Sequence, residues 1–191
     1  MNNLEEDDII GSKSCVVVDR VTTRKSFIVY ITGDIGPASD YVDLIHLLRY
    51  GQGIDAVVMH INSPGGYVST GIQLMNALHE TTIPTATVVD SHIASMASIL
   101  SVACRCVSVS KYCSMMFHDF SSIESGKGNE MHASINFHKD QFEQLLVTSC
   151  KGFLAKKEIS AILKGKDLYL PESDIVARLK KCNKLAQLTV N

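Results

Sequence analysis

The stretch Ala56-Val-Val-Met-His-Ile-Asn-Ser-Pro-Gly-Gly66 decides the fold class, because a run typical of a buried strand leads directly into a sharp turn. A helix is expected next, from the spacing of Ile72, Met75 and Leu78. The same order recurs on both sides of this unit. Further strands are expected at 26–31, 85–89, 106–110 and 114–117, and further helices at 40–50, 93–103, 131–150, 157–163 and 172–179. Strands that alternate with helices predict an α/β architecture with parallel strands.

The composition of the chain excludes some classes of function. The chain has 191 residues, 46% of them hydrophobic, and a formal net charge of −2. This length predicts one domain, or one domain with an appendage, and enough core to fold without disulfides or metals. The absence of a long basic block argues against nucleic acid as a partner. We therefore expect no metal and no other cofactor.

The sequence also predicts the cellular location of the protein and the oxidation state of its cysteines. The longest stretch without charged residues, 56–79, is interrupted by the Pro-Gly-Gly turn, so no membrane-spanning helix is expected. The N-terminus is acidic where a secretory signal is basic and then apolar, which predicts a cytoplasmic protein. The six cysteines are accordingly interpreted as free, mostly buried thiols.

In such folds, ligand-binding and catalytic residues lie where strands end and turns begin. The two glycines of the Pro-Gly-Gly turn can aim successive N–H groups at one point, where negative charge develops. Ser95 opens a predicted helix, His118 follows a predicted strand, and Asp167 is a carboxylate that can orient the imidazole. Asp119, directly after the histidine, is an alternative carboxylate. Each feature alone is more often a turn, a packing serine or a core histidine.

The order of three segments is more specific than any one of them. Ile61-Asn-Ser-Pro-Gly-Gly66, Ala94-Ser-Met96 and Met116-Phe-His118 together resemble the signature of ClpP, the proteolytic subunit of Clp protease. The ClpP family consists of self-compartmentalised serine peptidases. Similarity also covers Ile31-Thr-Gly-Asp-Ile35 and Gly126-Lys-Gly-Asn-Glu130. The resemblance divides the chain into a poorly matched segment 1–25, the region of the axial gate in the family, and a peptidase domain 26–191.

The resemblance implies roles for particular residues. Ser95 would be the nucleophile, His118 its general base and Asp167 the residue that fixes the imidazole tautomer. The N–H groups of Gly66 and Met96 would form the oxyanion hole. The residues that it implies for substrate binding are Gly65, Ser121, Gly126 and Gly128.

The resemblance also implies architecture and partners. It implies a ClpP/crotonase-like spiral of β-β-α units with a protruding handle helix at about 121–150. The strand at 121–128 before this helix would pair with an extended peptide. Subunits would form heptameric rings, stacked in pairs into a tetradecamer through the handles, which enclose unfolded polypeptide substrates. An AAA+ unfoldase is the implied partner, and a divergent, phage-encoded relative that works without an ATPase is the alternative.

Several positions depart from the family pattern. Ser91-His92-Ile93 stands where Gly-Gln usually precedes the serine motif, and Ala97 replaces a glycine. Asp119-Phe120 replaces Gln-Pro after the histidine, and a Gly-Leu pair is absent around Arg178. The alternative function is an inactive ring subunit or scaffold. A crotonase-type coenzyme A thioester enzyme is disfavoured, because such enzymes need no Ser-His-Asp set. A signal-peptide-peptidase relative with a Ser-Lys dyad is disfavoured because no membrane-spanning helix is expected.

Overall fold

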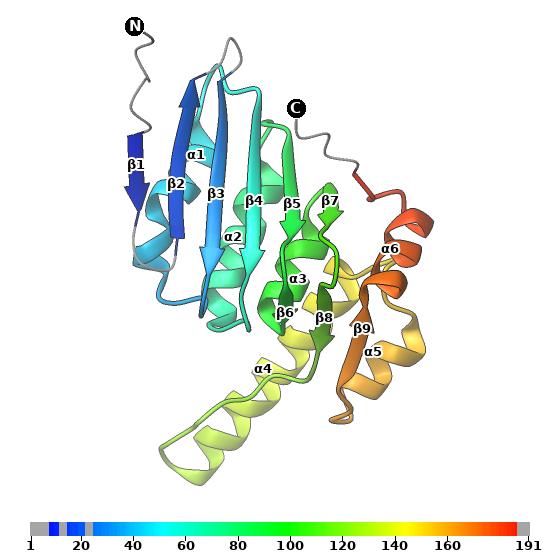
Figure 1. Ribbon diagram of the computed structural model, residues 1–191. Coiled ribbons are helices and arrows are strands. Elements are labelled where there is room, and N and C mark those ends of the chain that lie inside the picture. The colour runs from blue at the N-terminus through cyan, green and yellow to red at the C-terminus, as the bar shows by residue number, and fades with distance from the viewer. Residues whose placement is uncertain (1–7, 12–14, 22–24, 187–191) are drawn as a thin grey trace, which may run out of the picture.

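A six-stranded sheet is the largest layer of the computed structural model, which describes residues 8–11, 15–21 and 25–186 (Figure 1). Its strands are β1 (Asp8–Gly11), β2 (Cys15–Val21), β3 (Lys25–Thr32), β4 (Ala56–Asn62), β5 (Thr85–Val89) and β7 (Cys106–Val109), in that order across the sheet. The four strands from β3 to β7 pair in parallel, and β1 and β2 add an antiparallel edge. The predicted α/β architecture with parallel strands is confirmed.

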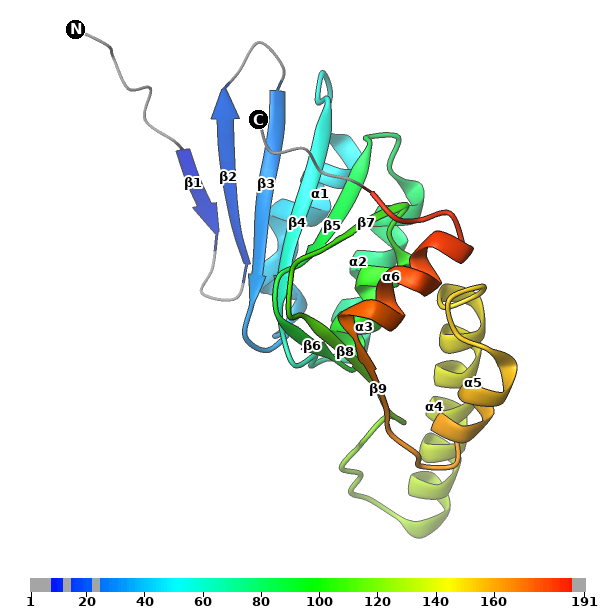
Figure 2. The same ribbon diagram turned by 45° about the vertical axis from the view of Figure 1, so that its right-hand side comes forward.

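Three helices cover one face of this sheet, as the two views in Figures 1 and 2 agree. They are α1 (Val42–Tyr50), which follows the short 3-10 helix η1 (Ala38–Tyr41), α2 (Val68–Glu80) and α3 (Met96–Ala103). Every second residue of β3 and β4 is buried against them, as the period-2 alternation of a half-covered strand requires. All eight residues of α3 are buried, so this helix forms the centre of the core.

A second, three-stranded sheet lies below the first and consists of β6 (His92–Ala94), β8 (Ser114–Phe117) and β9 (Leu168–Pro171). The chain passes from β5 to β6 to α3, and again from β7 to β8 to α4 (Gly128–Ser149). Each of these units contributes one strand to the large sheet, a short strand to the small sheet, and then a helix. This order is the β-β-α unit that the resemblance implied.

The predicted helix 93–103 is wrong at its beginning. Residues 92–94 form β6, whose three residues pair in parallel with β8, and the helix starts only at Met96. Ile93 and Ala94 are buried in this pairing. A contact with a strand 22 residues further along the chain therefore overrides the local helical pattern.

The helix α4 protrudes from the body of the molecule (Figures 1 and 2). Only Phe142, Leu146 and Ser149, near its C-terminal end, are buried. Within the described structure residues 121–127 join no sheet, Ile123 is fully exposed and Gly128 already belongs to α4, so the predicted strand 121–128 is not formed by this chain alone. An extended segment needs a partner for its backbone groups, and none of the described residues provides one.

After α4 the chain forms α5 (Lys156–Ile162), the strand β9 of the small sheet, and α6 (Glu172–Lys181). The helices α5 and α6 lie beside that sheet (Figure 2). Sequence analysis predicted both helices but missed β9. The strands β1 and β2 were also missed; they place residues 8–11 and 15–21 of the segment 1–25 at the sheet edge, while residues 1–7, 12–14 and 22–24 lie outside the described residues. No described helix is both long and apolar enough to cross a bilayer.

The cysteine side chains that the structure describes are free thiols. Cys104, Cys113 and Cys150 are buried, as predicted, whereas Cys106 is exposed and Cys182 is half-buried. Burial raises the pKa of the Cys150 thiol to about 12 and that of Cys113 to about 11, with Glu172 adding to the second shift. These two thiols are therefore unreactive at neutral pH.

Candidate active site

The segments that carry the predicted triad residues meet at one edge of the small sheet. Its strands β6 and β8 run parallel and β9 runs antiparallel to β8, so the ends of β6 and β8 meet the start of β9. Ser95 directly follows β6, and His118 directly follows β8. Asp167 directly precedes Leu168, which pairs with Phe117. One residue beyond that pair, His118 and Asp167 therefore stand opposite each other on the two strands.

Ser95 has a backbone conformation that serine rarely adopts. Its φ of 55° and ψ of −128° match the first central position of a type II′ turn, where glycine is usual. The backbone is held from both sides, since the Ser95 N–H donates to the Met116 carbonyl at 2.9 Å and the Ser95 carbonyl accepts from Ile99 at 3.2 Å. Such a conformation costs about 1–3 kcal/mol and typically occurs at functional sites.

The Ser95 hydroxyl has no structural hydrogen bond. Ser95 is the N-cap residue of α3, but its side chain does not cap the helix and bonds to no other group among the described residues. The hydroxyl therefore lies at the positive end of a buried helix, where a developing anion is stabilised.

The Pro-Gly-Gly turn packs directly on this strained serine. A Cβ atom on Gly65, whose φ is +101°, would lie 2.7 Å from the Ser95 Cβ and 3.0 Å from the Met96 nitrogen. Only glycine allows so close an approach at this φ. The two turns that sequence analysis singled out, 62–66 and 94–96, thus form one site.

Two backbone N–H groups beside Ser95 have no acceptor. Gly66 bridges to Ile35, whose N–H donates to the Gly65 carbonyl at 2.7 Å and whose carbonyl accepts from Tyr67 at 2.9 Å. This pattern turns the Gly66 N–H away from Ile35. Within the described part of the chain, neither that N–H nor the N–H of Met96, in the first turn of α3, donates a hydrogen bond.

The side chains of the predicted triad are not joined to one another. In the portion of the chain that the structure describes, no hydrogen bond links Ser95, His118 and Asp167. His118 is half-buried, and Asp167 is exposed and lines a cavity of about 280 Å³ together with residues of α5. The alternative carboxylate, Asp119, accepts the N–H of Phe120 at 2.9 Å. The backbone therefore brings the segments of the predicted triad together, while no hydrogen bond among the described residues joins their side chains.

A second serine–histidine pair lies at the opposite edge of the small sheet. His92 Nδ1 lies 2.8 Å from the Ser114 Oγ, within hydrogen-bond distance. Ser114 stands in a regular strand and lacks the positive φ of Ser95. The strained turn and the free N–H groups, rather than a hydrogen bond to histidine, distinguish the candidate site.

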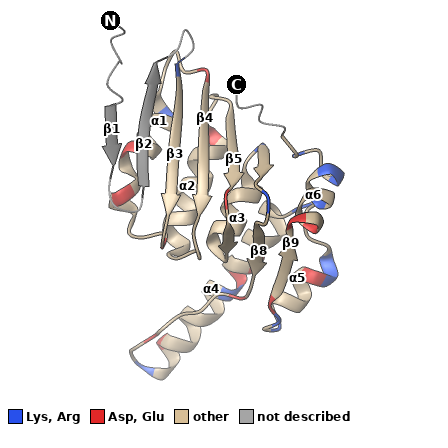
Figure 3. Ribbon diagram, in the orientation of Figure 1, with Lys and Arg blue, Asp and Glu red and all other residues tan. Residues whose placement is uncertain are grey.

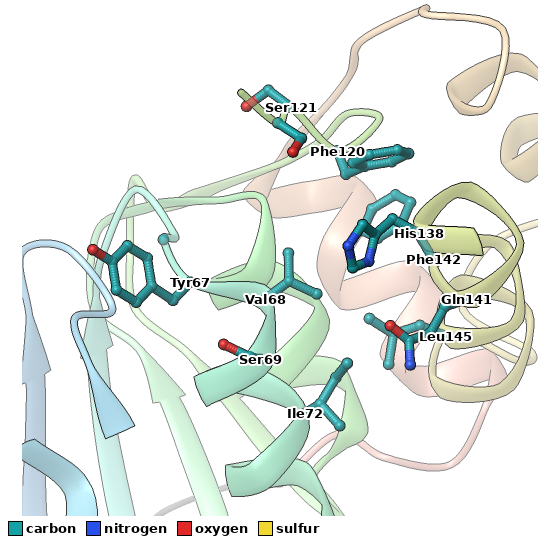
Figure 4. A pocket seen from close by; sticks show the side chains of 12 residues that line it. Tyr67, Val68, Ser69, Ile72, Phe120, Ser121, His138, Gln141, Phe142 and Leu145 are labelled. Atoms are coloured by element: carbon teal, nitrogen blue, oxygen red, sulfur yellow. The ribbon is translucent and has the colours of Figure 1, made fainter. Parts of the chain in front are cut away.

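A cavity of about 520 Å³ adjoins Gly66, between the start of α2 and the middle of α4 (Figure 4). Sequence analysis predicted Gly66 and Ser121 in the site, and both line the cavity. Gly126 and Gly128, also predicted to bind substrate, do not line it. The α2 and α4 residues of the lining were missed, although those of α4 recur at helical spacing. The lining side chains of α2 and α4 are Val68, Ser69, Ile72, His138, Gln141, Phe142 and Leu145.

The elements that form the site carry few charges. The segments β6, β8 and α3 contain no Lys, Arg, Asp or Glu, and Figure 3 shows charged residues mainly on α5, α6 and the handle. The described residues contain no group of three or more His, Cys, Asp or Glu side chains that is arranged to hold a metal ion.

This combination of β-β-α units, handle helix and serine turn defines a ClpP-like α/β peptidase in general terms. The family model for Clp protease matches residues 11–159, and the chain belongs to the Clp protease family. The matched region contains Gly66, Ser95 and His118, whereas Asp167 lies beyond its end. No curated protein matches the chain.

Proposed function

We propose that the protein is a serine endopeptidase that cleaves unfolded polypeptides with Ser95 as nucleophile, His118 as general base and Asp167 as the orienting carboxylate. The observation that carries the proposal is the strained backbone of Ser95, locked against Gly65 with two free N–H groups beside it. A structural serine at this position would gain nothing from a conformation that costs stability. Family membership supports the same class of activity.

The proposed reaction proceeds through an acyl-enzyme. The Ser95 hydroxyl attacks the substrate carbonyl carbon while His118 takes its proton, and the carbonyl oxygen becomes an oxyanion beside the N–H groups of Gly66 and Met96. The C–N bond then breaks, and His118 returns the proton to the leaving amine. A water molecule, activated by the same imidazole, releases the acyl group. No cofactor takes part in this sequence.

The side-chain arrangement sets a condition for activity. Because no hydrogen bond joins the three side chains among the described residues, His118 must turn toward Ser95, and Asp167 toward His118, when substrate binds or subunits assemble. Handle-mediated assembly into stacked heptameric rings would supply such a signal, and the protruding α4 supports it. We further propose a cytoplasmic location and delivery of substrates by an AAA+ unfoldase.

The first test is labelling with a fluorophosphonate, which reacts with activated serines. We expect the wild-type protein to be labelled in an assembled particle sized by native mass spectrometry, and Ser95→Ala to assemble without label. A wild-type particle that assembles but stays unlabelled, and that cleaves no peptide, would contradict the proposal and favour an inactive ring subunit. Labelling that persists in Ser95→Ala would remove Ser95 from its role.

The same assay distinguishes the two carboxylates. Asp167→Asn is expected to lower kcat by about 10³- to 10⁴-fold, because the imidazole loses its orienting partner. Asp119→Asn is the matched control and should change kcat by less than about tenfold, since the Asp119 carboxylate bonds to the backbone of Phe120. The reverse pattern would assign the orienting role to Asp119.

A further inference from the structure

The cavity beside Gly66 is built around aromatic rings. Phe120 and Phe142 face each other there, with ring centroids 5.8 Å apart at an angle of 53°. Val68 and Ile72 of α2 form the opposite wall (Figure 4). These four side chains provide the apolar environment in which another ring gains most from edge-to-face contact.

The α4 wall adds two polar side chains to this apolar cavity. His138, Gln141 and Phe142 lie on the same face of the helix, because Gln141 and Phe142 follow His138 by three and four residues. Figure 4 shows the His138 ring projecting from α4 toward α2. Both side chains lack a hydrogen-bond partner among the described residues, and the His138 ring packs edge-on with the Phe137 ring, with ring centroids 5.6 Å apart.

Another histidine of α4, His132, has a hydrogen-bond partner within the protein. His132 Nδ1 lies 2.9 Å from the Asn136 side-chain nitrogen, and His132 does not line the cavity. Among the described residues, the imidazole nitrogens of His138 and the side-chain amide of Gln141, both exposed, therefore remain available to a ligand at the cavity wall. Both groups include donors and acceptors, as does a phenol hydroxyl, so the match holds for either imidazole tautomer.

Gly66 links this cavity to the reaction centre. When the carbonyl oxygen of a substrate residue accepts a hydrogen bond from the Gly66 N–H, the side chain of that residue lies beside the cavity that Gly66 lines. We infer that the protein prefers tyrosine over phenylalanine as the residue before the scissile bond, with the ring packed against the Phe120 and Phe142 pair and the hydroxyl on His138 and Gln141. This inference rests on the proposed function, because it concerns the substrate of the same site.

The test compares two fluorogenic peptides that differ only in tyrosine or phenylalanine at this position. For the wild-type protein we expect kcat/KM to be about threefold to tenfold higher for tyrosine, as one or two partly exposed hydrogen bonds provide. In the double variant His138→Phe/Gln141→Met, which keeps side-chain size but removes the matching polar groups, the ratio should fall to about one. Rates for the phenylalanine peptide should change much less.

His132→Phe is the matched control, since it removes a histidine from the same helix but not from the cavity. It should keep both the assembly size and the tyrosine preference. Equal rates for the two peptides in the wild-type protein would overturn the inference while the proposed peptidase activity stands. A preference that survives in the double variant would overturn the assignment to His138 and Gln141.

A binding measurement separates this inference from the proposed function. In Ser95→Ala, product-like N-acetyl peptides ending in tyrosine should bind about threefold to tenfold tighter than those ending in phenylalanine, and the double substitution should abolish the difference. If no peptide is cleaved by the wild-type protein, the proposed function fails. The inference about the cavity then stands if this binding preference is found and falls if the two affinities are equal.

Discussion

At the scale of single residues, the candidate site depends on two backbone conformations that most residues cannot adopt. Ser95 has a positive φ without being glycine, and Gly65 has a positive φ with no space for a Cβ atom. The close packing of one against the other brings the turn after β4 onto the first turn of α3. The positions of the Ser95 Cβ atom and of the Met96 nitrogen beside it are therefore set by the backbone.

Gly65→Ala tests this packing. The added Cβ would lie 2.7 Å from the Ser95 Cβ and 2.8 Å from the Ala94 carbonyl oxygen, so the serine turn must shift. We expect kcat to fall at least about 10²-fold, since a displacement of about 1 Å at a reacting group has this effect. Unfolding followed by circular dichroism should also show a lower free energy of unfolding.

The control is Gly33→Ala, at a glycine with φ of +72° and no heavy atom within 4 Å of the added Cβ. It imposes the backbone strain alone, about 1 kcal/mol, and should leave kcat unchanged. Equal loss of activity in both variants would mean that strain, and not the contact with Ser95, is responsible.

At the scale of elements, the position of Asp167 depends on how α5, β9 and α6 are held together. Arg178 of α6 makes two hydrogen bonds, of 2.7 and 2.8 Å, to the Glu158 carboxylate of α5, and a third to the Phe153 carbonyl. Both charged side chains are largely buried, at 23% and 18% exposed. Because β9 lies between these helices in the sequence, this ion pair fixes the strand that begins directly after Asp167.

The pH dependence of stability reports on this ion pair. Hydrogen bonds from Arg178, with a smaller contribution from the Ala155 N–H, lower the pKa of Glu158 from 4.5 to about 2 in the folded protein. A lowered folded-state pKa stabilises the protein above the unfolded value, and this stabilisation is lost as pH falls from about 4.5 to about 2. Glu158→Gln should therefore destabilise by about 1–2 kcal/mol at pH 7 and by much less at pH 3.

Urea unfolding of the wild-type and variant proteins at pH 7, 5 and 3 measures this difference. Glu143→Gln is the control, because Glu143 is exposed on α4 and has no hydrogen bond or ion pair among the described residues. Its effect should be within about 0.5 kcal/mol at each pH. A Glu158→Gln penalty that stays constant down to pH 3 would show that the carboxylate charge is not its cause.

At the scale of the whole molecule, the protein exposes apolar surface on an element that projects from the body. Ile135 is 42% exposed and Phe137 is 63% exposed on α4, whose buried contacts are confined to its other end. An isolated helix with this surface gains little stability alone, which favours coverage by another subunit. The Clp protease family implies an oligomeric peptidase, in agreement with this surface.

Ile135→Asp should shift the protein from its assembled form to smaller particles in native mass spectrometry, because the aspartate would place a charge in an apolar interface. Helical content by circular dichroism should be unchanged, since Phe142 and Leu146 still anchor α4. Asn136→Asp adds the same charge at the neighbouring exposed position and should leave the assembly size unchanged. An intact Ile135→Asp assembly would exclude this part of the handle from the interface.

Much of the fold could be predicted because its signals are local. The strand 85–89 was predicted with its observed bounds, and the helix of Ile72, Met75 and Leu78 lies in α2, since burial periodicity is visible within a few turns. The residue types of the candidate site were also available from the sequence. Helix and strand order and the candidate nucleophile therefore required no knowledge of distant contacts.

The sequence by itself thus determined the order of the helices and of the strands β3, β4, β5, β7 and β8, the apolar faces and the chemical groups available for catalysis. Only the tertiary structure decided that 92–94 is a strand, that β9 stands beside β8 with Asp167 opposite His118, and that α4 contributes His138 and Gln141 to the cavity. It also decided that residues 121–127 form no strand with the described residues. The physical reason is that these features depend on contacts between segments 20 or more residues apart, whose pairing free energy outweighs local propensity.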